Sequence, residues 1–380
     1  MDWEDLKSQL SQLRWQGTPA ADVDTALTAC LEDPAGLPPL DQMLVAGDLI
    51  AIAMEDLTNT SAQLLDALLK WLSGHAVSPE HLAVVLPMGA TRSQGLPAVE
   101  AIQESHPGVN WVKHDPQDPY AAAYLAADAD AHPIYFNRAL IDADVLIGIR
   151  SSRGTHPKAR PIAMASELYP QFTNQETWER LYKSFALKSK PKRSWKEAVI
   201  EAEDWLGFVF WIESFQDPDG NLARLQAGNH QQLDHLRSSN LHSLWLQNEG
   251  PQTDLTVIDV PDSLGWTWTD WLTAIDKVRC SQPEPPKVLL RGTLPEWPHC
   301  PDESQEPPAA EDLLSQWIEM ECERLAADES IWVLGPSISE LQEAAGWFWL
   351  DNVAEAAKLI ERFENTQLVN GSFVAPCTEN

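Results

Sequence analysis

The stretch LIAIAMEDLTNTSAQLLDALLKWL, residues 49–72, decides the fold class. Its first six residues, Leu49–Met54, form a short apolar run of the kind found in buried strands of parallel sheets. A polar group that begins at Thr58 follows, and such residues are typical of helix starts. Leucines then recur at the spacing of one helix face, at Leu64, Leu65, Leu68, Leu69 and Leu72. A buried strand followed directly by an amphipathic helix indicates an α/β fold.

The same alternation continues on both sides of a polar linker at residues 248–252. In the first half we predict strands at residues 82–86, 109–112, 134–136 and 145–149, helices at 98–104, 195–204 and 230–246, and a hairpin at 208–225 with an Asp-Gly turn. In the second half we predict strands at residues 255–260, 287–290 and 331–334, and helices at 266–278, 311–325 and 352–363.

The whole chain has 380 residues, more than one hydrophobic core usually supports. We therefore predict an α/β fold with two domains, whose mainly parallel sheets are covered by helices. The expected parts are a helical extension at residues 1–32, an α/β domain at residues 33–247 and a βα domain at residues 253–380.

The charge and the cysteines limit the possible partners and compartment. The 26 Lys and Arg against 57 Asp and Glu give a formal net charge of -31, which repels nucleic acids and anionic membranes. The five cysteines include no C-x-x-C pair, which argues against a zinc site or a disulfide framework. The sequence has neither a signal-peptide pattern nor an apolar stretch of ~20 residues. We expect a soluble cytoplasmic protein.

Common catalytic motifs are absent. No two of the 18 glycines are spaced G-x-G, and there is no G-K-[ST], G-x-S-x-G or H-E-x-x-H sequence. Dinucleotide-binding, P-loop, serine-hydrolase and zincin chemistries are therefore not predicted.

Several segments in a fixed order carry a more specific signal. They are DPAGLPPLDQMLVAGD (33–48), AMEDLTNT (53–60), VLPMGATR (85–92), KHDPQDP (113–119), IYFNRALIDADVLIGI (134–149) and FVFWIESFQDPDGNLARLQAGN (208–229). In this order they resemble the lactate racemase family, and the resemblance runs from Asp33 to the end of the chain. It implies a lactate-racemase-like fold with a site between the two domains.

Members of that family invert the carbon that bears a hydroxyl beside a carboxylate, and they use a nickel pincer nucleotide tethered to a lysine. The resemblance puts Thr91 at the first proton-transfer histidine, Arg153 at the second, Ala163 at the tethering lysine and Tyr182 at the nickel-binding histidine. Aligning His156 with the second histidine instead leaves Ser166 at the lysine. A family Gln and Lys near the substrate fall near Asp270 and Thr273. We therefore expect no cofactor and favour a pseudoenzyme.

Polar residues nevertheless remain near the expected site. The candidate ligand-binding residues are Asp56, Asn59, Thr91, Arg92, Arg150, Arg153, Arg160 and Tyr182. No acid occurs between Asp144 and Glu167, while four cations and a histidine do, and ligands of open α/β sheets bind at the carboxyl ends of strands. This favours a small carboxylate or phosphate ligand. The alternative interpretation is that Asp56 caps the next helix, that His114 and Asp115 order a loop, and that the arginines are solvated.

Three functional hypotheses stay open. The first is a non-racemising protein that binds a small anion or a protein partner in the interdomain cleft. The second is an active 2-hydroxy-acid racemase or epimerase, for which His114, His156 and Lys158 are the candidate catalytic residues. The third is a structural or regulatory interaction protein. A basic run from Arg180 to Lys196 is either an exposed loop or a docking patch for an acidic partner, such as a second copy of the chain.

Overall fold

A computed structural model describes most of the chain. The described residues are 2–12, 14–15, 22–87, 96–128, 130–152, 168–185, 195–207, 209–217, 220–246, 253–260, 268–280, 284–295, 318, 322, 325, 331–335 and 347–370. The statements below concern these residues.

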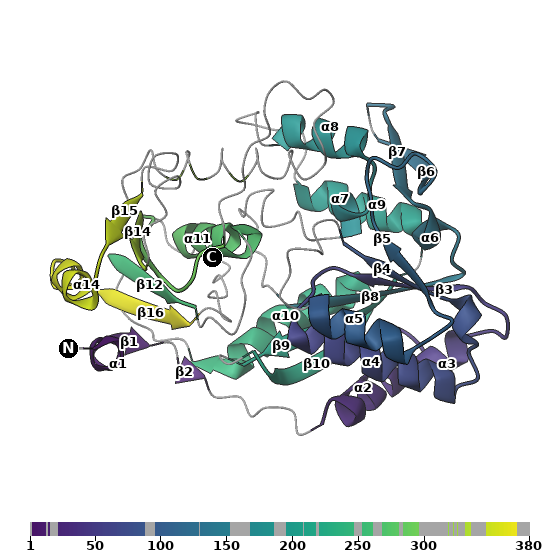
Figure 1. The fold of residues 1–380 in the computed structure, drawn as a ribbon, viewed down its shortest axis with the longest axis horizontal. Coiled ribbons are helices and arrows are strands. Elements are labelled where there is room, and N and C mark those ends of the chain that lie inside the picture. The colour runs from purple at the N-terminus through teal and green to yellow at the C-terminus, as the bar shows by residue number, and fades with distance from the viewer. Residues whose placement is uncertain are drawn as a thin grey trace.

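The first of two six-stranded sheets forms in the N-terminal half, with the strand order β10-β9-β8-β3-β4-β5 (Figure 1). Its strands are β3 (Ile50–Met54), β4 (Leu82–Leu86), β5 (Asn110–Lys113), β8 (Val145–Ser151), β9 (Val209–Gln216) and β10 (Leu222–Gly228). Only β10 is antiparallel, because it returns from β9 through a hairpin turn in which Gly220 has φ +85°. The carboxyl ends of β3, β8 and β9 therefore meet at one edge of the sheet.

Side chains alternate between the two faces of this sheet, and each face has its own helices. One face is covered by α2 (Val23–Glu32), α3 (Leu40–Met43), α4 (Asn59–Gly74) and α5 (Leu96–Ser105). The other face is covered by α6 (Arg138–Ile141), α7 (Leu168–Gln171), α8 (Gln175–Phe185), α9 (Trp195–Leu206) and α10 (His230–Leu244). The leucine stripe of α4 is buried in the first core, as its sequence spacing predicted.

The predicted strand at residues 134–136 exists, but it does not belong to this sheet. It is β7 (Pro133–Asn137), which forms a separate antiparallel pair with β6 (Ala122–Ala127). A short 3-10 helix, η1 (Pro79–His81), precedes β4.

The second six-stranded sheet has the order β1-β16-β12-β13-β14-β15, and all of its pairs are parallel. Its strands are β1 (Ser11–Gln12), β12 (Leu255–Asp259), β13 (Lys287–Arg291), β14 (Ile331–Leu334), β15 (Phe348–Leu350) and β16 (Thr366–Asn370). Helix α11 (Trp268–Cys280) packs on one face, while α1 (Trp3–Lys7) and α14 (Val353–Ile360) pack on the other. The predicted helix at residues 311–325 lies outside the described residues except for three positions.

The first 32 residues contribute to both sheets. Helix α1 and strand β1 join the second sheet, whereas α2 packs against α4 and β10 of the first. Between them, β2 (Arg14–Trp15) pairs with β11 (Trp245–Leu246). The expected helical extension is therefore divided between two sheets, and the domain bounds given above stay a prediction.

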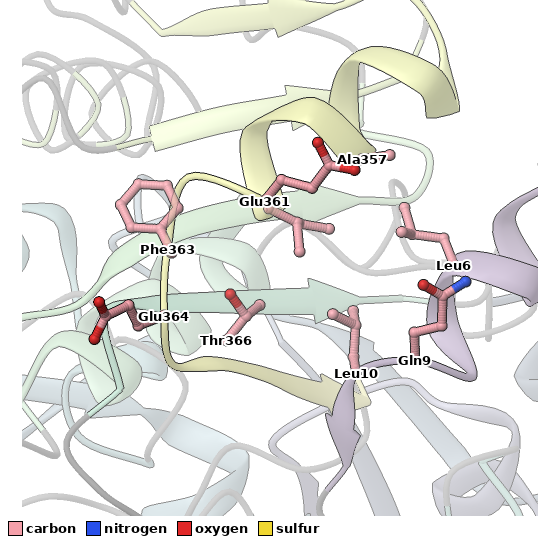
Figure 2. Close-up of a pocket in the computed structure, with 9 residues that line it drawn as sticks. Leu6, Gln9, Leu10, Ala357, Glu361, Phe363, Glu364 and Thr366 are labelled. Carbon is pink, nitrogen blue, oxygen red and sulfur yellow. The ribbon is translucent and has the colours of Figure 1, made fainter.

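A shallow hollow of about 280 Å³ lies where α1 meets α14 and the start of β16 (Figure 2). Leucines and Phe363 line it, with Glu361 and Glu364 at its rim. None of the candidate site residues lines this hollow.

The described structure confirms an α/β fold built on mainly parallel sheets. Among the described residues, none of the helices combines the length and the apolar character needed to cross a membrane.

Candidate functional site

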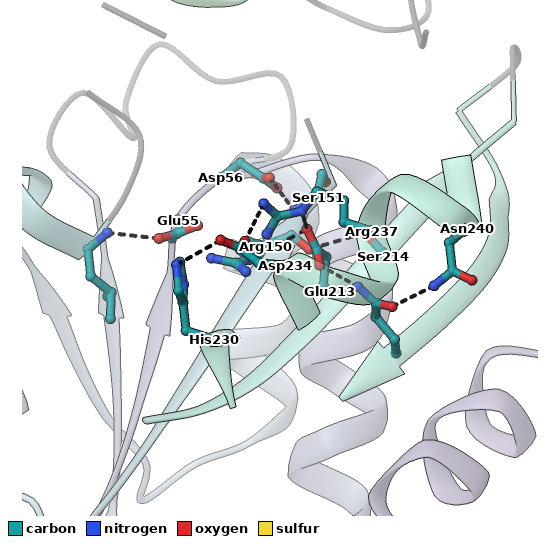
Figure 3. Close-up of polar contacts among 12 residues, drawn as sticks. Glu55, Asp56, Arg150, Ser151, Glu213, Ser214, His230, Asp234, Arg237 and Asn240 are labelled. Atoms are coloured by element: carbon teal, nitrogen blue, oxygen red, sulfur yellow. Dashed lines mark hydrogen bonds and ion pairs between the residues drawn. The ribbon is translucent and has the colours of Figure 1, made fainter. Parts of the chain in front are cut away.

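A buried group of charged side chains lies at the carboxyl ends of β3, β8 and β9, on the face covered by α7, α9 and α10 (Figure 3). We call it the strand-end cluster, and it consists of Glu55, Arg150, Glu203, Glu213, His230, Asp234 and Arg237. The sheet register creates it, because Arg150 pairs directly with Glu213 and the backbone N–H of Glu55 donates to Ile149.

Arg150 is the centre of the cluster. Its guanidinium lies 4.3 Å from the centroid of the Trp211 ring, which attracts the cation through the ring quadrupole. Its Nε lies 3.7 Å from Oε1 of Glu213, and the two side chains are only 6% and 1% exposed. Its Nη2 is buried and has no hydrogen-bond acceptor. The alternative interpretation of the sequence, in which the arginines are solvated, is wrong for Arg150, because its side chain is buried.

Glu213 is ionised because several donors surround it. Nε of Arg237 donates to its Oε1 at 2.6 Å, and Nε2 of Gln226 donates to its Oε2 at 2.6 Å. Burial alone would raise the pKa of this carboxyl, but the charges of Arg237 and Arg150 together with these hydrogen bonds hold the pKa below its ordinary value. The buried acid is thus charged and shared between two arginines.

His230, the first residue of α10, lies between two more acids. Its Nδ1 is 3.2 Å from Oε2 of Glu203 on α9, at an angle too poor for a hydrogen bond. Its Nε2 is 3.4 Å from Oδ2 of Asp234, whose other oxygen accepts a 2.8 Å hydrogen bond from Arg237. His230 is therefore connected to Arg150 through Asp234, Arg237 and Glu213.

Two further polar atoms near this edge are buried without a hydrogen-bond partner. They are Oγ of Ser152, directly after β8, and Oε1 of Gln171 in α7. The amide Nε2 of Gln171 donates to the carbonyl of Glu55 at 3.1 Å, and the side chain of Glu55 accepts from the backbone N–H of Leu168 at 2.8 Å. These contacts attach α7 to the end of β3.

Asp56 points to the opposite face, where its Oδ2 accepts a 2.8 Å hydrogen bond from the backbone N–H of Ser151. The expectation that Asp56 caps α4 was wrong. Thr58 is the cap, and its Oγ1 accepts from the backbone N–H of Ser61 at 3.1 Å. Asn59 is the first residue of α4 and is exposed. The carboxylate of Asp56 instead fixes the end of β8 beside the end of β3.

His114, a candidate catalytic residue, has local contacts at both ring nitrogens. Nδ1 accepts from the amide of Asn137 at 3.1 Å, and Nε2 donates to the carbonyl of Thr173 at 3.0 Å. Burial lowers the pKa of His114 to about 4, which makes the ring neutral at neutral pH. The adjacent Asp115 accepts from the backbone N–H of Gln117 at 2.9 Å. These contacts have the form expected of residues that order a loop.

The other candidates are only partly described. Thr91, Arg92, Arg153, His156, Lys158 and Arg160 lie outside the described residues, as do Ala163 and Ser166. Tyr182 and Thr273 lie in α8 and α11, where only their backbone is described, and Asp270 lies in the first turn of α11. Of these candidates, the structure places Asp56 at the end of the strand that carries Arg150, because Asp56 accepts from the backbone N–H of Ser151.

Sequence reasoning missed most of the strand-end cluster. One signal was present, because Glu213 interrupts the apolar run FVFWIESF, and a buried acid needs charged partners. Its partners could not be read from the sequence, since Arg150 and Arg237 lie on other elements.

The comparison with known families agrees with this architecture. Residues 7–151 match the lactate racemase N-terminal domain. This segment is thus similar to the lactate racemase N-terminal domain. The match to the lactate racemase domain begins before Asp33, where the resemblance was expected to start. No curated protein sequence matches the chain.

Solved structures extend the lactate-racemase-like fold to almost the whole chain. The lactate racemase apoprotein from Thermoanaerobacterium thermosaccharolyticum matches with a TM-score of 0.69 and 13% identity, over 96% of this chain and 94% of that chain. A Thermotoga maritima protein solved by structural genomics matches with a TM-score of 0.59 and 12% identity, over 95% of this chain and 99% of that one. At these identities the likeness concerns the fold.

The nickel pincer nucleotide that the lactate racemase family implies would need an amine as its tether and an imidazole on its metal. The resemblance places Ala163 at the tether and Tyr182 at the metal, and neither side chain is an amine or an imidazole. The buried His114 and the partly buried His230 face protein groups with both ring nitrogens. Within the described ranges, no three His, Cys, Asp or Glu side chains are grouped to hold a metal.

Proposed function

We propose that this lactate-racemase-like protein does not perform nickel-pincer catalysis and instead binds a small anion, a carboxylate or a phosphate, beside Arg150. The proposed site is the carboxyl edge of β3, β8 and β9, which is the edge where open α/β sheets bind their ligands.

The buried Nη2 of Arg150 carries this proposal. A buried polar group without a partner costs about 1–3 kcal/mol, and more when it is charged, so native proteins rarely leave one unmatched. Arg150 has such a nitrogen, and Ser152 and Gln171 each add an unmatched oxygen close to the same strand ends. A carboxylate or phosphate oxygen can accept from Arg150 and Ser152, while a hydroxyl on the same ligand can donate to Oε1 of Gln171.

The charge of the neighbouring residues is compatible with an anion. Glu213 is bound most closely by Arg237, at 2.6 Å, and lies 3.7 Å from Nε of Arg150. Among the described residues, no carboxylate pairs with both outer nitrogens of the Arg150 guanidinium, which lies 4.3 Å from the centroid of the Trp211 ring. A planar, fixed guanidinium is well suited to bind a carboxylate or a phosphate.

The experiment uses the purified full chain with three probes, lactate, acetate and inorganic phosphate, in isothermal titration calorimetry. We expect binding of at least one probe and a loss of affinity of about tenfold or more in Arg150→Gln, because a charge-assisted contact contributes about 1.5–3 kcal/mol. Arg362→Gln is the matched control, since it removes the same charge from an exposed position and should not change the affinity.

Because Glu213 is buried, Arg150→Gln could also weaken the fold. Arg150→Lys keeps the charge but loses the planar donor pair, so it should fold and still bind weakly. Nickel analysis, intact mass and a chiral lactate assay complete the test. Stoichiometric nickel, an adduct on a lysine or racemisation of lactate would overturn the proposal, as would unchanged affinity in both Arg150 variants.

A further inference from the structure

We infer that a proton on His230 controls the anion site: the site binds its anion when His230 is an imidazolium and releases it when the ring is neutral. This inference rests on the proposed function, and it adds the regulation of the same site.

The position of His230 is the first reason. The ring is 16% exposed and faces charged groups from three elements: Glu203 on α9, Asp234 on its own helix α10, and Arg150 on β8. The two carboxylates lie on opposite nitrogens, at 3.2 Å from Nδ1 and 3.4 Å from Nε2. A neutral imidazole has a proton on only one nitrogen, so it must leave one nitrogen lone pair facing a carboxylate.

The connection to Arg150 is the second reason. Asp234 contacts both His230 and Arg237. Arg237 lies 2.8 Å from Asp234 and 2.6 Å from Glu213. Glu213 is in turn the ion-pair partner of Arg150 (Figure 3). A change at His230 therefore acts on Arg150 through adjacent charged contacts in a buried region, where electrostatic effects are screened only weakly.

The charge balance of the strand-end cluster sets the sign. Four of its members are acids, Glu55, Glu203, Glu213 and Asp234, while Arg150, Arg237 and a protonated His230 are the only cations among its seven described members. Loss of the His230 proton makes this cluster more negative by one charge beside the proposed anion, and like charges repel. Protonation of His230 consequently favours the anion, and linkage requires that the bound anion raise the proton affinity of His230.

The pKa of His230 is shifted upward, and its neighbours explain the direction of the shift. Burial, the largest single effect, lowers the pKa of His230, and Arg150 acts in the same direction. The hydrogen bond to Asp234 and the charge of Glu203 outweigh both, so the pKa is raised above its ordinary value of 6.5. The imidazolium is therefore lost as the pH rises through a value above 6.5.

The test follows lactate affinity and the NMR titration of His230 in the full chain. Lactate is a suitable probe because the charge of its carboxylate is constant above pH 6. We expect the affinity of the wild type to fall about five- to tenfold as the pH rises through the pKa of His230. His230→Gln should bind weakly at every pH, and His235→Gln, an exposed position on the same helix, should behave as wild type.

Glu203→Gln provides a second variant that keeps His230. Removal of that carboxylate should lower the pKa of His230, so the fall in affinity should move to lower pH by the same amount as the NMR titration. Binding that does not change with pH while His230 titrates would overturn this inference alone, as would pH dependence retained in His230→Gln. A wild type that binds none of the three anions at any pH would overturn the proposed function, and this inference with it.

Discussion

At the scale of single residues, Gly148 explains why Arg150 can be held in place. Gly148 pairs with Trp211 across β8 and β9, and a Cβ on Gly148 would lie 2.3 Å from the Trp211 ring. The absence of a side chain therefore creates the space for the aromatic ring on which Arg150 rests. Gly148 lies in the segment 134–149 quoted in the sequence analysis. The sequence could not predict that Trp211 would lie opposite, because the local sequence does not determine which strands pair.

Gly148→Ala should consequently destabilise the fold by about 1–3 kcal/mol, the usual cost of an overpacked core. It should also weaken anion binding, since Trp211 must move away from Arg150. Gly74→Ala is the control, because no atom lies within 4 Å of its added Cβ, and a helical Gly-to-Ala change is neutral or stabilises by up to about 1 kcal/mol. Urea denaturation measures the unfolding free energy of both variants. Equal values for Gly148→Ala and the wild type would show that the Trp211 ring can move to make room.

At the scale of elements, apolar periodicity predicted most strands and helices. The elements that it missed form because of tertiary contacts that a local pattern does not contain. The strand at 82–86 and the strand at 331–334 were predicted with their observed bounds. Strand β6 was missed because AAYLAA contains no β-branched residue, so only its pairing with β7 shows it as a strand. The strand-end cluster was missed for a related reason, because its members come from five elements or element ends.

The start of α4 allows a sharp test of which polar residue acts as its cap. Thr58→Ala should destabilise the protein by about 1 kcal/mol, because it removes the acceptor for the Ser61 N–H. Asn59→Ala, one position later and exposed, should change the unfolding free energy by less than ~0.5 kcal/mol. Thermal and urea unfolding of the two variants would contradict this assignment if Asn59→Ala were the more destabilising change.

At the scale of the whole molecule, the N-terminal segment is a structural part of the C-terminal sheet. Asp259, buried at the end of β12, accepts from Trp3 Nε1 at 3.3 Å and is paired with Lys7 at 3.1 Å and Arg291 at 3.0 Å. Trp3 is also a buried member of the core formed with α14. The sequence suggested a separate helical extension because the partners of Trp3 lie more than 250 residues away.

Trp3→Ala should therefore weaken the second sheet, by about 3–5 kcal/mol if the site behaves as a core position. Hydrogen exchange of β12 and β16 should accelerate more than that of β3 and β8. Glu4→Ala, an exposed neighbour in α1, is the matched control and should leave exchange in all four strands unchanged. Equal acceleration in both sheets would indicate that α1 stabilises the molecule as a whole and not the second sheet in particular.

The pairing of β1 with β16 has a consequence for how the chain is made. Ser11 pairs with Gln367, so the segment around Ser11 lacks its partner until about 356 further residues have been made. At roughly 5–20 residues per second, that interval lasts on the order of 20 to 70 s. During it, the apolar side chains of α1 are exposed on the ribosome, while the first sheet can already assemble. Folding during synthesis is thus expected to proceed in two stages, with the second sheet closing only after β16 has left the ribosome.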